Sequence, residues 1–256
     1  MNNTRPLRKL TAAALLIFSC NLALSAAPVN GEPSAMSDQS TSSAPLSARQ
    51  QAIPLIASSM ASSNMEKLNV ALNQGLDNGL TVNEAKEILV QLYAYTGFPR
   101  SLNALTELMK VTEARKQRGI NDIQGNEPVS AIPVGEELLR VGTENQTKIS
   151  GAPVKGPLFD FAPVINQFLQ THLFGDIFAR DNLDWQSREL ATVGALAATP
   201  GVEAQLLSHM RASLRVGLTA EQLRQLVQLL RAQGENQAAD RAEQALQQAT
   251  TPAPAA

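Results

Sequence analysis

Residues 79–109 constrain the fold more than any other stretch, because they predict two amphipathic helices joined by a tight turn. Thr81 can cap the first helix, and Glu84, three residues later, can reach back to complete a capping box. The residues that would form its buried face recur at helical spacing: Ala85, Ile88, Leu89, Leu92 and Thr96.

The turn and the second helix have equally clear signals. Gly97 suits a left-handed helix stop, and Pro99 can open the next helix, where its missing N–H costs nothing. The apolar stripe expected to pack the second helix is Leu102, Leu105, Leu108 and Met109. Two helices that are each buried along one face need a third surface to pack on, which predicts an all-α, bundle-like fold.

The same helical pattern occurs upstream and returns near the C-terminus. Further helices, the first of them kinked at Pro54, are predicted over four ranges: 47–61, 65–76, 184–198 and 202–216. Another helix should begin at Thr219, which can form a capping box with Gln222. Because Gly79-Leu80-Thr81 recurs as Gly217-Leu218-Thr219, we expect a duplicated unit. We call the separation of these two tripeptides along the chain the repeat offset.

The first unit resembles the carboxymuconolactone decarboxylase family, which includes the alkyl-hydroperoxidase D (AhpD) type peroxidases. The resemblance rests on the pattern G-L-T-x-x-E-x-x-E-I-L-x-Q, followed by Y-x-G-F-P-x-x-x-N-A, within residues 79–104. It implies an AhpD-like helical bundle built here from two tandem repeats.

The second unit resembles the family most in its first half, over residues 172–193 and in Leu206-Leu-Ser-His209. The resemblance covers about 46–110 and 158–230, and the copy departs from the pattern after Leu230. We therefore divide the chain into a signal peptide (1–26), a flexible lead-in (27–45), a first repeat (46–114), a Gly-rich, loop-like linker (115–156), a second, partly degenerate repeat (157–248) and a tail (249–256).

The N-terminus predicts export. Arg5, Arg8 and Lys9 precede an apolar run over 10–24, and small residues follow at 25–27, which is the pattern of a secretory signal peptide. The run is shorter than the ~20 residues of a membrane span, so we expect a periplasmic or secreted protein. Cys20, the only cysteine, offers lipid anchoring as an alternative; cleavage near Ala26 would leave no cysteine in the mature protein.

The composition disfavours several classes of protein. The formal charge of −2, the absence of a basic run and only 4% aromatic residues argue against a nucleic-acid binder. No zinc-ligand cluster, phosphate loop or serine-nucleophile elbow is present, so we expect neither a metal nor an organic cofactor.

The resemblance implies a redox site whose thiols are missing here. Thr96 and Pro99 occupy the family's two cysteine positions, Asn103 its histidine position and Glu84 its glutamate position. A thiol peroxidase needs a thiolate to attack peroxide. Peroxiredoxin activity would therefore belong to this chain by family label only.

The resemblance to decarboxylase-type members leaves a lyase-type activity open. Glu84 and His209 are the candidate catalytic groups, because opening a lactone or losing CO2 requires a proton to be moved. Either could instead be structural, Glu84 as a capping residue and His209 as a half-buried helix histidine. The candidate substrate-binding residues are Arg180, Arg188, His172, Tyr93 and Tyr95. The two arginines could instead form structural ion pairs with Asp176 or Glu189, and the other three residues could serve only in packing.

Two functions remain open at the level of sequence. The first is an exported, cofactor-free enzyme that acts on a small carboxylate or lactone. The second is a family member that binds a small molecule, or serves structurally, without turnover. The resemblance also implies ring assembly, so we expect a homotrimer with pseudo-sixfold character and a pocket shared by Glu84 and His209.

Overall fold

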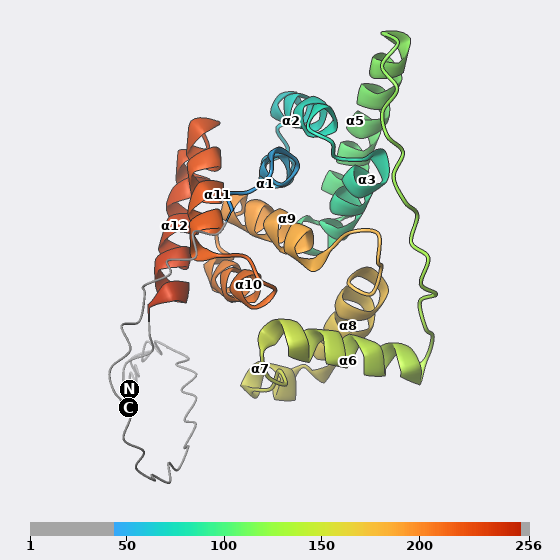
Figure 1. Ribbon diagram of the computed structural model, residues 1–256. Helices are drawn as coiled ribbons and strands as arrows, with labels where there is room; N and C mark the ends of the chain where they lie inside the picture. The colour runs from blue at the N-terminus through green and yellow to red at the C-terminus, as the bar shows by residue number, and fades with distance from the viewer. Residues whose placement is uncertain (1–43, 252–256) are drawn as a thin grey trace, which may run out of the picture. The chain divides into compact units, whose positions relative to one another are not determined.

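The computed structural model describes residues 44–251, and this part of the chain is helical with no strand (Figure 1). None of the described helices is long and apolar enough to cross a membrane. The signal peptide, Cys20 and most of the lead-in lie outside the described residues, as does the end of the tail. Predictions about them therefore stay predictions.

The first half contains five helices: α1 (Ala48–Ala61), α2 (Met65–Asp77), α3 (Val82–Gln91), α4 (Tyr93–Thr96) and α5 (Phe98–Gln117). α3 and α4 together occupy the range predicted as one helix, which is broken at Leu92. The Thr81–Glu84 capping box forms at the start of α3. Gly97 has a positive φ of 85° between α4 and α5, and Pro99 lies in the first turn of α5. The helix–turn–helix prediction is confirmed.

The second half contains four further helices that bear on the predicted duplication: α9 (Trp185–Ala198), α10 (Glu203–Arg215), α11 (Ala220–Ala232) and α12 (Asn236–Thr250). The start of α10 follows that of α2 by the same offset that separates Gly217 from Gly79. The same offset separates the start of α3 from the start of α11. It also separates the start of α5 from the start of α12. The repeat offset first seen in one tripeptide thus holds for three helix starts.

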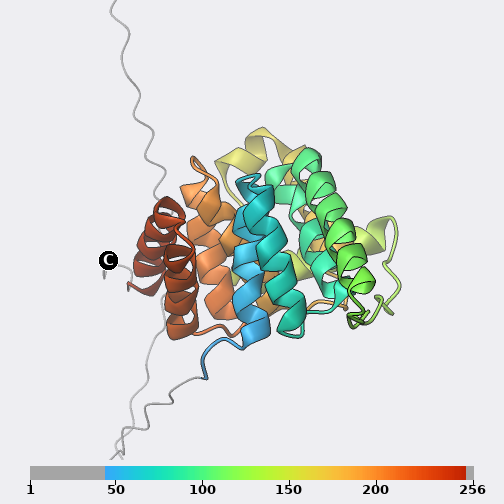
Figure 2. The same cartoon turned by 90° about the horizontal axis from the view of Figure 1, so that it is seen from above.

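The core forms where the two halves meet. α1 packs along α9, and the backbones come closest at Gly194, where an added Cβ would lie 2.7 Å from the carbonyl oxygen of Pro54. α1 continues through Pro54 as one helix. Figure 2 shows α1 beside α2, with α5 on one side and the α11–α12 pair on the other.

The expected loop over 115–156 is wrong in its middle, where α6 (Glu136–Ser150) forms. α6 packs against the π-helix η1 (Leu169–Ile177), which follows the short helices α7 (Pro157–Phe161) and α8 (Pro163–Phe168). A Cβ at Gly142 would lie 1.7 Å from the Gln170 carbonyl oxygen. This glycine therefore permits a close helix contact and does not interrupt the helix.

The predicted apolar stripe of α5 also needs correction. Leu108 is buried, but Leu102 and Met109 are 60% and 64% exposed. The face of α5 that packs inward carries five buried residues: Ser101, Ala104, Leu108, Val111 and Arg115. Only part of the predicted stripe therefore lies on the buried face, and Leu102 and Met109 lie outside it.

Candidate functional site

A buried polar cluster joins α3 to α9, and we name it the Glu87 cluster after the carboxylate at its centre. Glu87 accepts hydrogen bonds from Arg180 Nε at 2.9 and 3.0 Å and from Arg188 Nη2 at 2.9 Å. Asn182 Nδ2 donates to the same carboxylate at 3.2 Å. Both predicted arginines thus meet on one side chain that the sequence analysis had not singled out.

Arg188 lies inside the protein, in an ion pair with Glu87. Its side chain is fully buried, its second terminal nitrogen donates to Gln91 Oε1 at 2.9 Å, and Phe178 lies beside the guanidinium. Burial holds the pKa of Arg188 below its ordinary value, while Glu87 opposes that shift. The ion-pair alternative therefore describes Arg188, although with Glu87 as the partner and not Asp176 or Glu189.

His209 on α10 forms a second polar site, with Glu189 on α9. His209 Nδ1 lies 2.9 Å from Glu189 Oε2, and the histidine side chain keeps 14% exposure while Glu189 has none. The other carboxylate oxygen of Glu189 is buried without a hydrogen-bond partner among residues 44–251. A buried, half-paired carboxylate behind a partly accessible imidazole is costly for folding alone.

Tyr95 completes this second site. Its ring meets the His209 ring edge-on, with centroids 5.3 Å apart. The hydroxyl is buried beside Thr192 and makes no well-formed hydrogen bond within the described part of the chain. Burial, and then the charge of Glu189, raise the pKa of Tyr95 far above its ordinary value, against weaker effects of Thr192 and Arg188. The phenol therefore keeps its proton.

Glu84 and His209 have different partners in the structure. Glu84 pairs with Arg49 of α1 and accepts the Thr81 backbone N–H at 2.9 Å. His209 contacts Glu189 and Tyr95. The capping alternative thus accounts for Glu84, and a pocket shared by Glu84 and His209 stays a prediction.

The remaining predicted residues lie outside both polar sites, and of these Thr96 is buried in α4. His172 Nδ1 is 2.7 Å from Asp176, and its ring is tilted against Tyr93, which stacks on Phe98 at 4.2 Å. Among the degenerate redox positions, Thr96 donates to the Leu92 carbonyl, Pro99 starts α5 and Asn103 is exposed. None of these three positions supplies a thiol.

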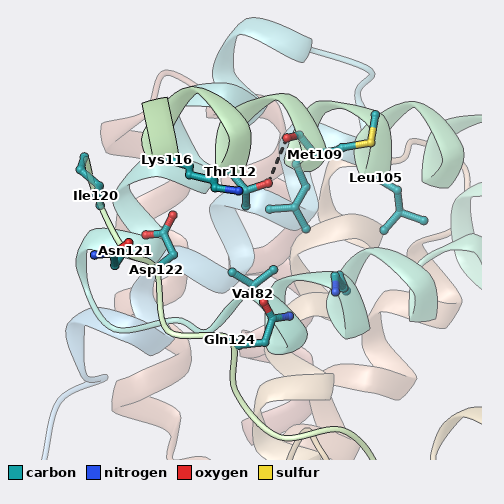
Figure 3. Close-up of a pocket in the computed structure, with 11 residues that line it drawn as sticks. Val82, Leu105, Met109, Thr112, Lys116, Ile120, Asn121, Asp122 and Gln124 are labelled. Atoms are coloured by element: carbon teal, nitrogen blue, oxygen red, sulfur yellow. Dashed lines mark hydrogen bonds between the residues drawn. The ribbon is translucent and has the colours of Figure 1, made fainter. Parts of the chain in front are cut away.

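A hollow of about 550 Å³ lies apart from both polar sites (Figure 3). α5 forms one wall, the start of α3 forms the other, and the segment over 120–124 closes one end. Its lining side chains include Val82, Lys86, Leu105, Met109 and Lys116. Across the described ranges, no group of three His, Cys, Asp or Glu side chains could hold a metal ion.

Sequence reasoning missed Glu87, Gln91 and Glu189 as members of these sites. Glu87 was already part of the quoted pattern G-L-T-x-x-E-x-x-E, one helical turn after Glu84. Its position there predicts the same face of α3 as Glu84. The pairing with α9 could not be read from the pattern, because it depends on how two distant helices cross.

Among known protein families, one has a model that matches the second half of the chain. The model of the carboxymuconolactone decarboxylase family matches residues 163–250, from the start of α8 to the end of α12. No curated protein matches the chain at a significant level. The matched range contains His209, Glu189 and both arginines of the Glu87 cluster.

Proposed function

We propose that this protein is an exported member of the carboxymuconolactone decarboxylase family that moves a proton on a small carboxylate or lactone without a cofactor. His209 is the group that transfers the proton. The observation that carries the proposal is the His209–Glu189 pair, because its carboxylate is fully buried and only half paired within residues 44–251. The family match over 163–250 supports the assignment to this family.

The geometry gives each group of this site a role. With Nδ1 protonated and donating to Glu189, the Nε2 atom of His209 keeps a lone pair and can accept a proton. Glu189 then stabilises the imidazolium that forms, as buried carboxylates do for catalytic histidines. Tyr95 remains protonated beside the ring and holds its orientation.

The second histidine supplies a matched control for the test. We would assay the mature protein against a panel of small lactones and β-keto carboxylates, following ring opening and CO2 release. His209→Gln should lower the turnover number by ~10²–10⁴-fold, the usual contribution of a general acid or base. His172→Gln, which changes a candidate substrate-binding residue in an exposed pair with Asp176, should lower the turnover number far less. Equal activity of both variants would exclude the proposed role.

A binding protein without turnover is the second candidate function. Glu84, Arg180 and Arg188 are each engaged by other side chains, and the hollow of Figure 3 is lined largely by apolar groups. Saturable ligand binding with no turnover across the panel would favour it. A thiol peroxidase is disfavoured because Thr96 and Pro99 carry no thiol, and hydroperoxide consumption by mature protein would contradict that view.

Assembly into a homotrimer of fused repeats is part of the proposal. Exposed apolar side chains that a second copy could cover are gathered on α7 and α8: Leu158, Phe161, Val164, Ile165 and Phe168. Light scattering should give three times the mass of one chain, and Phe161→Ser with Phe168→Ser should shift it toward the monomer. Val70→Ser, at an exposed position on α2, should not. A monomer at every concentration would rule out this assembly.

Export is also proposed. N-terminal sequencing of periplasmic protein should begin near Ala26 or Ala27. An intact Met1 on cytosolic material would contradict export, and a lipid on Cys20 would establish the anchored alternative.

A further inference from the structure

The hollow of Figure 3 has an apolar body with two cationic groups on opposite walls. Figure 3 shows Leu105, Met109 and Lys116 along α5, facing Val82 across the gap. Lys86 comes from α3 and Lys116 from α5. A volume of about 550 Å³ lies in the range that accommodates small organic ligands.

The charge of this hollow is positive, because its one carboxylate, Asp122, is paired with Arg115, which also pairs with Asp77, and two lysines remain in the lining. Both oxygens of Asp122 accept from Arg115, at 2.8 to 3.0 Å. Lys86 Nζ contacts only the amide oxygen of Asn83, at 3.1 Å, and the ammonium of Lys116 has no partner within residues 44–251. The nearby Glu113 accepts from Gln117 on the adjoining surface.

The second half of the chain offers an internal comparison for this surface. At the repeat offset, Leu105 corresponds to Glu243 and Met109 to Gln247. Glu243 pairs with Arg231 at 2.9 Å. Packing α12 against α11 therefore needs no apolar residue at these two positions, where Glu243 and Gln247 are exposed. In the first half Met109 is exposed too, while Leu105 is partly buried against the core.

We propose that this hollow binds a small amphipathic monocarboxylate, with its apolar chain on Leu105 and Met109 and its carboxylate between Lys86 and Lys116. An apolar lining alone would bind hydrophobic ligands of any charge, whereas two lysine side chains favour a ligand that carries a negative charge. The site shares no lining residue with the His209–Glu189 pair, so it does not depend on the proposed catalytic function.

Octanoate is the probe, with 1-octanol and octylammonium as its neutral and cationic counterparts. Calorimetry on the mature protein should show one saturable octanoate site, at least tenfold tighter than for either counterpart and weaker as salt is raised. Leu105→Glu with Met109→Gln, which installs the residues of the second half, should weaken octanoate binding at least tenfold. Lys116→Gln should weaken it severalfold.

Two controls keep the result specific to this hollow. Leu102→Gln changes an exposed apolar residue of α5 outside the lining, and His209→Gln changes the other site; both should bind octanoate as the parent does. Equal affinity for octanoate and 1-octanol would overturn the role of the lysines. Absence of saturable octanoate binding would overturn the proposed site. If, in addition, Leu105→Glu with Met109→Gln converted an oligomer into the monomer, the hollow would be covered by a second copy of the chain and not by a small ligand.

Discussion

The two halves of the molecule bury equivalent residues and expose different ones. Positions related by the repeat offset are buried in both halves, for example Leu68 and Leu206, Ala104 and Ala242, and Leu108 and Leu246. At the surface, the α3–α5 side is apolar and hollowed, while the α11–α12 side carries ion pairs. The shared interior maintains the helix arrangement, which leaves each exterior free to differ.

The polar interiors of the two halves differ as well. His209 has Ala71 as its counterpart, and Glu87 has Gln225. Gln225 only accepts the Leu46 backbone N–H at 2.8 Å, whereas Glu87 holds two arginines. The buried carboxylate of Glu87, which pairs with two arginines, therefore has an uncharged side chain at the equivalent position of the second half.

The largest expected effect comes from breaking the Glu87 cluster. Glu87→Ala would leave Arg188 buried without its carboxylate and should cost about 3–5 kcal/mol of unfolding free energy, measured by denaturant titration. Gln225→Ala, the counterpart, should cost about 1 kcal/mol, one hydrogen bond. Replacing Glu87 and Arg188 together by Met should recover much of the loss. Equal losses for Glu87→Ala and Gln225→Ala would show that the two positions are equivalent after all.

An effect of intermediate size concerns the dependence of folding stability on pH, through Tyr95. Above pH ~10, the ordinary tyrosine pKa, the unfolded chain releases the Tyr95 proton while the folded protein, with its raised pKa, retains it. Stability should therefore fall by up to about 1.4 kcal/mol per pH unit there. Tyr95→Phe should remove this part of the fall, as measured by denaturant titration at a series of pH values. Absorbance at 295 nm that showed Tyr95 ionising in the folded protein near pH 10 would contradict its burial.

The smallest effect should be shared by both halves. Thr81 and Thr219 form equivalent capping boxes, with Glu84 and Gln222. Thr81→Ala and Thr219→Ala should each cost about 1 kcal/mol of unfolding free energy, by thermal or denaturant melts. A much larger loss for Thr81→Ala would indicate that the Arg49 pairing of Glu84 depends on the cap.

The sequence alone determined the helices and their ends, because capping boxes, glycine stops and apolar periodicity act within a few residues of the chain. It predicted Thr81, Gly97 and Thr219 correctly on that basis. It also singled out His209 and Arg188 without their partners. Gly142 shows the limit: its role is set by Gln170, a residue on another helix.

Only the tertiary structure decided which side chains meet. The pairing of Arg180 and Arg188 on Glu87, and of His209 with Glu189, depends on the crossing of helices far apart in the chain. The outward direction of Leu102 and Met109 was decided in the same way, because the neighbouring helices cover the face of α5 that carries Ala104, Leu108 and Val111. Periodicity gives a helix an apolar face, but the neighbouring helices determine which face is buried.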